Sequence, residues 1–353
     1  MTQDIKKFFP YSSIRDQQQE AIDFALRSIK EEGKKFIIIE AGTGVGKSAI
    51  GLTVARCLYN DTTTPTNKES GSYFLTTQKI LQDQYVKDFG GFKGPMKSIK
   101  SSSNYTCNFN RKTSCGESLR ALKTADKSTS FWKSCSFNCV YRKAKESFIG
   151  GSEGVTNFPY FLAETQYSGK LLPKQVMVID EAHNIDSELS KFIEITITDK
   201  FCQSFLNFRL PTGMTQFQYI QWVSDTYMTT ISSKLKHLSK MLEKYVGLQD
   251  KIKSGEFASI AKKYDMLDKH VCKVRRFLEL YNKDNWIMNE IEGDKYTSKK
   301  VQFKPIDIAP YADEMLYSYG DVVIMMSATI LDKDAFIECV GIPTDQVAFI
   351  SLR

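Results

Sequence analysis

The residues best suited to chemistry follow a short apolar run near the N-terminus. The run Phe36–Ile39 leads through Glu40 into a glycine-rich turn and then into a helical stretch. Glycines let backbone N–H groups turn inward around phosphates, and the following helix presents its positive N-terminus to them. The turn therefore predicts an ATP site built from Ala41, Gly42, Thr43, Gly44, Val45, Gly46, Lys47 and Ser48. Lys47 would neutralise the β/γ-phosphates and the Ser48 hydroxyl would bind Mg²⁺. A chance match in a glycine-rich turn is the alternative.

A second set of candidate residues follows another apolar run, Val176–Ile179. It consists of Asp180, Glu181 and, two residues further, His183. A carboxylate at the carboxyl end of a buried strand lies beside a phosphate loop in an α/β sheet. Asp180 would hold Mg²⁺, Glu181 would orient or deprotonate the attacking water, and His183 would couple nucleotide state to the rest of the protein. Taken alone, these residues could also form an exposed acidic turn.

Four of the eight cysteines are clustered. Cys57, Cys202, Cys272 and Cys339 are scattered among apolar neighbours, which is typical of small buried hydrophobes. The others, Cys107, Cys115, Cys135 and Cys139, fall within 33 residues of one another. Cys135 and Cys139 are four residues apart, so they could share one helix face. The cluster is either a ligand set or four unliganded thiols.

The clustered cysteines lie in the most basic part of the chain. The whole chain carries +7, whereas the stretch Lys93–Lys145 has twelve Lys and Arg against only Glu117 and Asp126. Aromatic residues are threaded through it: Phe92, Tyr105, Phe109, Phe131, Trp132, Phe137 and Tyr141. Cations pair with phosphates and aromatic faces stack on bases, so the composition fits a single-stranded nucleic-acid surface. A solvated basic lobe is the alternative.

Short apolar runs predict the elements that position these residues. Five of them indicate buried parallel strands: Phe36–Ile39, Tyr73–Thr76, Val155–Asn157, Val176–Ile179 and Val322–Met326. Helical stretches at Ser48–Leu58 and Lys79–Lys87 follow the first two. Alternating strands and helices predict a doubly wound α/β sheet.

A mostly helical insertion interrupts this pattern over residues 199–303. Apolar residues step by three and four from Ile231 to Tyr245, and again from Ile260 to Leu278. Trp286–Glu290 and Ser298–Phe303 indicate a hairpin. The apolar stripes predict core packing rather than a ligand site.

Several motifs, in the same order along the chain, resemble the DinG/XPD family of superfamily 2 iron–sulfur DNA helicases. Asp180 to Asp186 (Asp-Glu-Ala-His-Asn-Ile-Asp) resembles their Walker B segment. Arg15-Asp-Gln-Gln18 is similar to their adenine-reading motif, and Thr76-Thr77-Gln78 with Gln82 to their DNA-contacting motif Ia. The segment from Tyr141 to Leu162 resembles the one after their metal cluster, and Ser327-Ala328-Thr329 their motif III, which links hydrolysis to DNA movement. The first glycine of the generic phosphate loop is Ala41 here, as in superfamily 2.

The resemblance implies a fold and cofactors. It implies a RecA-like P-loop motor domain in three parts (1–104, 142–198 and 304–353), interrupted by a cluster domain (105–141) and a helical arch (199–303). Cys107, Cys115, Cys135 and Cys139 would hold a [4Fe–4S] cluster. Their spacing departs from the commonest family pattern and from a zinc ribbon, so Zn²⁺ remains the alternative.

The resemblance also implies an activity. It implies ATP-driven translocation on single-stranded DNA, with 5′→3′ unwinding at duplex junctions and DNA contacts from Thr76, Thr77, Gln78, Lys100, Lys112 and Lys133. A second RecA-like motor domain, in cis or in trans, is expected, because only about 24 residues follow Thr329. The rival interpretation is a nucleotide-gated DNA-binding or regulatory module that does not unwind DNA.

Composition sets the remaining bounds. The 42% hydrophobic and 25% charged residues are ordinary globular values. The N-terminus lacks a signal pattern and the longest apolar runs are too short to span a bilayer, which predicts a soluble intracellular protein without a membrane partner.

Overall fold

The computed structural model describes residues 2–61, 66, 68–90, 94–122, 125–246 and 255–352. The chain folds as two compact units. Unit 1 comprises residues 1–100, 144–192 and 307–353, and unit 2 comprises 101–143 and 193–306. The cysteine segment and the helical insertion thus share one unit. The finer five-segment division made from the sequence stays a prediction.

A parallel sheet is the centre of unit 1. Its strand order is β10-β1-β9-β5-β2-β4-β3, seven strands among the described residues. Their bounds, in chain order, are β1 Phe36–Ala41, β2 Glu69–Thr76, β3 Met96–Ser98, β4 Glu153–Asn157, β5 Lys174–Asp180, β9 Gly320–Ser327 and β10 Val347–Leu352. All five predicted strands are present and pair in parallel, so the predicted α/β fold class is confirmed.

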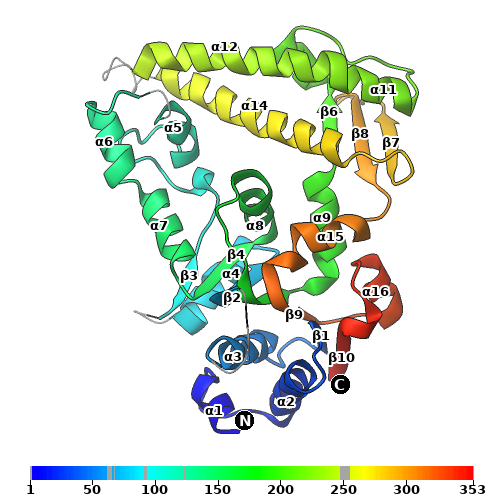
Figure 1. The fold of residues 1–353 in the computed structure, drawn as a ribbon. Helices are drawn as coiled ribbons and strands as arrows, with labels where there is room; N and C mark the ends of the chain where they lie inside the picture. The colour runs from blue at the N-terminus through cyan, green and yellow to red at the C-terminus, as the bar shows by residue number, and fades with distance from the viewer. Residues whose placement is uncertain are drawn as a thin grey trace. The chain divides into compact units, whose positions relative to one another are not determined.

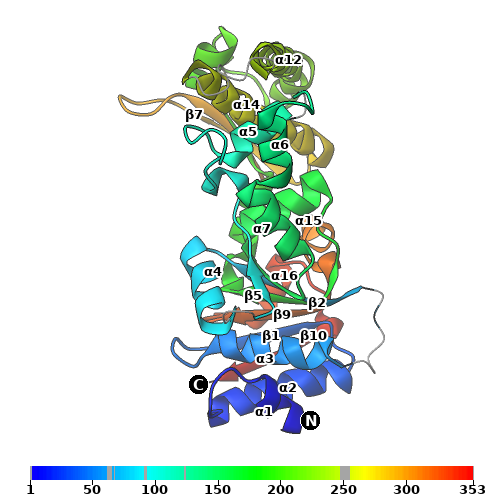
Figure 2. The same ribbon diagram turned by 90° about the vertical axis from the view of Figure 1, so that its left-hand side faces the viewer.

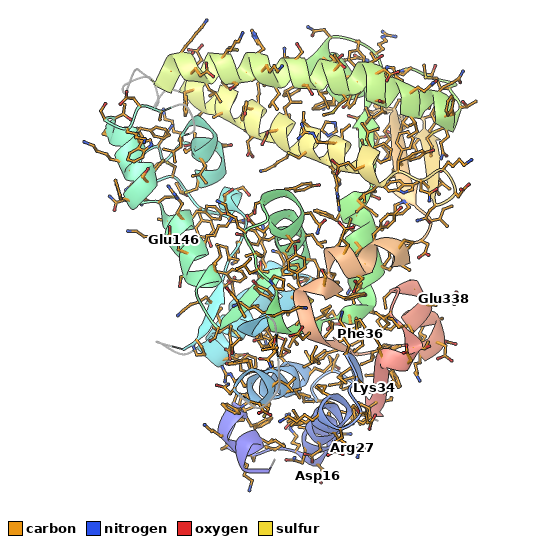
Figure 3. All side chains as sticks on the ribbon, viewed as in Figure 1. Asp16, Arg27, Lys34, Phe36, Glu146 and Glu338 are labelled. Carbon is orange, nitrogen blue, oxygen red and sulfur yellow. The ribbon has the colours of Figure 1, made fainter. Side chains whose placement is uncertain are left out.

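Successive side chains of β1 point to opposite faces of the sheet, and both faces are covered. Ile37 and Ile39 of β1 join a core cluster with α2 and α3, and Figure 2 shows α1, α2 and α3 together on one side of the strands. Phe36, labelled in Figure 3, points the other way, and its ring meets that of Tyr317 edge to face at 5.2 Å. A strand buried on both faces reads as a continuous apolar run, which is what made β1 recognisable.

The helices of unit 1 connect these strands. The α-helices are α1 Thr2–Phe8, α2 Asp16–Lys30, α3 Lys47–Tyr59, α4 Lys79–Tyr85, α7 Val140–Ile149, α8 Phe158–Ala163, α9 Ile185–Ile193, α15 Ala309–Met315 and α16 Lys333–Cys339. The first four residues of α7 and the last residue of α9 belong to unit 2. The shorter turns are the π-helical segments η1 Val86–Gly90 and η3 Glu164–Ser168 and the 3₁₀ turns η4 Ala182–Asn184, η7 Tyr317–Tyr319 and η8 Thr344–Gln346. The predicted helices after β1 and β2 are α3 and α4.

Unit 2 combines helices with a small antiparallel sheet. Its main helices are α5 Cys115–Leu122, α6 Ser130–Phe137, α11 Gln216–Trp222, α12 Met228–Val246 and α14 Gly255–Leu280. The sheet has the order β6-β8-β7, with β6 Ile195–Thr198, β7 Trp286–Ile291 and β8 Lys300–Pro305. The short turns are η2 Ser102–Asn104, α10 Asp199–Phe201, η5 Cys202–Leu206 and η6 Val223–Tyr227.

The two long helices of unit 2 pack along each other (Figure 1). Their apolar stripes meet in this contact: Ile231 and Leu238 of α12 are buried, as are Leu267, Val271 and Val274 of α14. The stripes are therefore core, as the periodicity predicted. None of the helices in the described part of the chain is long and apolar enough to span a bilayer.

Candidate nucleotide and metal sites

The phosphate loop joins the end of β1 to the start of α3. Gly44 and Gly46 have φ angles of +85° and +90°, in the left-handed region that favours glycine. A Cβ on Gly46 would also lie 2.6 Å from the Gln18 side-chain nitrogen. Both conformation and space therefore require glycine at position 46.

Lys47 extends back over this loop. Its Nζ donates to the carbonyl oxygens of Ala41 at 3.0 Å and Gly42 at 3.5 Å. The ammonium group is thereby held at the mouth of the turn, where the helix N-terminus already favours negative charge. The position and the positive charge of the Lys47 ammonium group therefore suit the binding of a phosphate group.

Arg15 and Gln18 brace the same loop from the start of α2. Arg15 Nη1 donates to the Gly44 carbonyl at 3.0 Å, and Gln18 Nε2 donates to the Val45 carbonyl at 2.8 Å. The Gln18 oxygen accepts from the Arg15 backbone N–H at 3.0 Å. Because both ends of the buried Gln18 amide are engaged, this side chain supports the loop; adenine reading by the pair stays a prediction.

Asp180 lies at the carboxyl end of β5. Its Oδ2 is 3.5 Å from the Ser48 hydroxyl and accepts from the Tyr85 hydroxyl at 3.0 Å. Burial raises the pKa of Asp180, and the hydrogen bond from Tyr85 opposes that rise. Parallel strands bring their carboxyl ends to one edge of the sheet, so Asp180 meets the phosphate loop although 132 residues separate it from Ser48.

Glu181 begins a tight turn after β5. It adopts φ +55°, and its backbone N–H donates to Asp180 Oδ1 at 3.0 Å. The side chain is about one-third exposed, and its Oε2 lies 3.4 Å from His183 Nδ1. A non-glycine residue in this conformation is uncommon, and such residues cluster at functional sites.

His183 links this turn to the end of β9. Its Nδ1 lies 2.9 Å from the Ser327 hydroxyl, and its Nε2 lies 2.9 Å from the Asn184 side-chain nitrogen. The Ser327 hydroxyl donates to the Thr329 carbonyl at 3.0 Å. Ser327 is buried, Ala328 is half-buried and Thr329 is exposed. The two motifs, far apart in the sequence, thus meet at one edge of the sheet.

Sequence reasoning missed two residues of this edge. Glu40, the one acidic residue of β1, accepts from the Ile330 backbone N–H at 2.5 Å and from the Ser351 hydroxyl at 2.7 Å, which ties β1 to the chain after motif III and to β10. Tyr85 holds Asp180. A charged residue ending an apolar strand was a usable signal for Glu40; Tyr85 falls three residues after Gln82, on the same helix face.

The four clustered cysteines of unit 2 line one cavity. Its wall is completed by Asn108, Phe109, Ser118, Leu119 and Ser134. The Cys115 and Cys139 sulfurs are 3.8 Å apart, and a hydrogen bond from Cys135 lowers the pKa of Cys107 to about 5. All four side chains are buried. Within the described residues, no three His, Cys, Asp or Glu side chains are arranged to hold a single metal ion.

The residues predicted to contact DNA differ in exposure. In unit 1, Thr76 is buried with its hydroxyl donating to the Gln78 carbonyl at 3.1 Å, Thr77 is half-buried, and Gln78 is exposed. Lys100 forms an ion pair with Asp83 at 2.7 Å. In unit 2, Lys112 and Lys133 are exposed. Two further lysines of the basic stretch, Lys93 and Lys123, and the adjoining Phe92 lie outside the described residues.

Comparison with known sequence families identifies a family for this chain. The sequence model of the family described as type III restriction enzyme, res subunit, matches residues 11–210, more than half of the chain. The chain belongs to this family. The match spans the phosphate loop, the clustered cysteines and the Asp180–His183 turn.

One curated relative is similar in sequence to this member of the res-subunit family. It is the ATP-dependent DNA helicase YoaA of Haemophilus influenzae, 24% identical over 280 residues, which cover 65% of this chain and 42% of the relative. The chain therefore spans less than half the length of that relative.

Solved XPD structures share the fold. An XPD helicase superposes with a TM-score of 0.58 at 15% identity, covering 97% of this chain and 63% of the other. A truncated XPD gives 0.53 at 14% identity, covering 96% of this chain and 99% of the other. The resemblance to the DinG/XPD helicases predicted from the motifs is confirmed, and these similarities support a helicase-like nucleotide-binding motor.

Proposed function

We propose that this chain is the nucleotide-binding half of an ATP-dependent DNA helicase motor. The observation that carries the proposal is the gathering of Lys47, Ser48 and Asp180 at one edge of the sheet, with the Ser48 hydroxyl 3.5 Å from the Asp180 carboxylate. A cation at a helix N-terminus and a hydroxyl beside a buried carboxylate are the groups that bind a nucleotide triphosphate with Mg²⁺.

Each side chain has a separate part in this proposal. Lys47 would leave its two carbonyl partners to neutralise the β/γ-phosphates, while Ser48 and Asp180 would hold Mg²⁺, whose charge would offset that of the phosphates. Glu181, less buried than Asp180, orients or deprotonates the attacking water. Arg15 and Gln18 flank the adenine side of the loop.

The proposed polymer is single-stranded DNA, entered from duplex junctions with 5′→3′ polarity. The exposed Gln78 of unit 1 and the exposed Lys112 and Lys133 of unit 2 supply polar and cationic contacts. The relative of similar sequence is named as a DNA helicase, which supports DNA over RNA.

We further propose that Cys107, Cys115, Cys135 and Cys139 hold a [4Fe–4S] cluster. Four buried thiols lining one cavity are the donor set of such a cluster, in which each cysteine binds a different iron. The cluster would tie together α5, α6 and the turns around them, so its role here is to hold this part of unit 2 in shape.

An ATPase assay with a partner chain tests the proposed function. Closing two RecA-like domains on ATP brings in the arginine that stabilises charge on the γ-phosphate, which is worth about 10³–10⁵ in rate in related enzymes. The chain should bind ATP and single-stranded DNA, hydrolyse slowly alone, and turn over faster when a second motor domain is supplied. Nucleotide-dependent DNA binding with no gain in turnover would favour the regulatory module instead.

A further inference from the structure

A buried phenol reaches the proposed magnesium carboxylate from the helix α4. Tyr85 is the last residue of α4 and only 3% exposed, and its hydroxyl donates to Asp180 Oδ2 at 3.0 Å. No motif assigned from the sequence includes this residue. Its hydroxyl therefore donates a hydrogen bond to Asp180 Oδ2, an oxygen of the carboxylate proposed to bind Mg²⁺.

The surroundings hold the phenol ring in place. It packs against the rings of Phe74 on β2, at 5.7 Å, and Phe89 in the π-helical turn η1, at 5.6 Å. These two aromatic contacts hold the ring where its hydroxyl meets Asp180.

The helix itself is anchored to the sheet one turn earlier. The fully buried Gln82 donates to the Ile99 carbonyl at 2.9 Å, and its oxygen accepts from the Asn157 side chain at 3.1 Å. Two buried polar side chains on one short helix, Gln82 bonded beside the sheet edge and Tyr85 bonded to Asp180, leave α4 little freedom to shift without moving the carboxylate.

The Asp180 carboxylate is consequently oriented from two sides. Oδ1 accepts from the Glu181 backbone N–H at 3.0 Å, while Oδ2 accepts from Tyr85 and lies 3.5 Å from Ser48. A carboxylate oxygen has more than one lone-pair site, so Oδ2 can accept from Tyr85 and still face a cation. Hydrogen-bond partners of a metal-binding side chain fix its orientation toward the metal.

We propose that Tyr85 is a positioning residue for Mg²⁺, orienting Asp180 toward the ion bound with ATP and linking that carboxylate to α4. This inference rests on the proposed nucleotide site. It adds a residue that acts through the side chains it contacts, Asp180 first and the Ser48 hydroxyl beside it.

Tyr85→Phe tests the proposal, because it removes the hydroxyl and keeps the packed ring. The measurement is the Mg²⁺ concentration giving half-maximal binding of a fluorescent ATP analogue, together with analogue affinity in EDTA. We expect the Mg²⁺ midpoint to rise roughly tenfold, the usual lower range for losing a ligand's supporting hydrogen bond. Affinity in EDTA should stay unchanged, which also reports that the variant is folded.

The matched control is Tyr73→Phe. Tyr73 is also buried in the sheet, and its hydroxyl donates to the Leu172 carbonyl at 2.8 Å. An unchanged midpoint in Tyr85→Phe, or an equal shift in both variants, would overturn the proposal. Failure of the unmodified chain to bind the analogue with Mg²⁺ would instead overturn the proposed function on which it rests.

Discussion

Two adjacent carboxylates at the end of β5 have different surroundings, and the difference suits different tasks. Asp180 is 7% exposed and accepts hydrogen bonds at both oxygens, whereas the Glu181 side chain is about one-third exposed beside His183. A fixed buried carboxylate suits a metal, and a more accessible one suits a water molecule. Glu181 itself adopts a left-handed backbone conformation, with φ +55°.

Glu181→Gln should therefore separate binding from hydrolysis. The amide keeps the size of the side chain and loses its basicity, so ATP affinity should hold while turnover falls by about 10²-fold or more. Steady-state turnover with equilibrium ATP binding measures both. Glu146→Gln, at an exposed carboxylate of α7 labelled in Figure 3, is the control and should change neither. Loss of ATP binding in Glu181→Gln would contradict the assigned role.

At the scale of elements, apolar runs predicted the centre of the sheet but not its edges. The five predicted strands include the neighbours β1, β9, β5, β2 and β4, which are buried on both faces and so read as continuous apolar segments. The edge strand β3 has three residues, Met-Lys-Ser, which carry no periodic signal. The other edge strand, β10, was not predicted either. Its sequence, Val-Ala-Phe-Ile-Ser-Leu, is apolar enough that composition could have indicated a strand.

The site was predictable where motifs carry it and not where contacts depend on three-dimensional packing. The phosphate loop and the Asp180 turn each follow a strand, so parallel pairing was enough to bring them together. The contact of Tyr85 with Asp180 depends on how α4 is rotated, and the contact of Glu40 with Ile330 depends on the path after β9; spacing encodes neither. Nor did spacing reveal which walls enclose the four thiols.

The cysteine-lined cavity should contain iron and sulfide in anaerobically purified protein, which should be brown. Serine ligates iron more weakly than cysteine thiolate, so Cys→Ser at any of the four positions should bleach the colour and loosen unit 2 around α5 and α6. Iron and sulfide analysis with visible absorption measures this. Cys202→Ser changes a buried cysteine outside the cavity and should keep the colour. A colourless protein with one zinc per chain would contradict the iron–sulfur assignment but keep the four-thiol site.

The basic stretch should contribute phosphate contacts to single-stranded DNA. Changing Lys100, Lys112 and Lys133 to Glu should weaken binding and reduce the slope of log affinity against log salt by about 2, at roughly 0.7 per lost contact. Fluorescence anisotropy over a salt series measures the slope. The same charge change at Lys6, Lys7 and Lys333, exposed lysines outside the stretch, is the control. Equal slopes in the unmodified chain and in both triple variants would show that the basic stretch is a solvated surface without phosphate contacts.

At the scale of the whole molecule, two compact units are interleaved along one chain. The chain leaves unit 1 after Lys100 and returns to it at Ala144. It leaves again after Phe192 and returns at Asp307. Unit 1 retains a continuous sheet despite both excursions, because each one returns to a strand that pairs within it. The nucleotide residues all belong to unit 1, so nucleotide binding is a property that this unit should show by its own residues.

Equilibrium binding of Mg·ATP tests that central claim most directly. Lys47→Ala removes the cation from the phosphate loop, and a hydrogen bond to a charged group is worth about 1.5–3 kcal/mol, so affinity should fall about 10- to 100-fold. Lys34→Ala, just before the opposite end of β1 and labelled in Figure 3, removes the same charge and should leave affinity unchanged. Equal affinities in the unmodified chain and in Lys47→Ala, or no binding by the unmodified chain, would contradict the nucleotide-binding assignment.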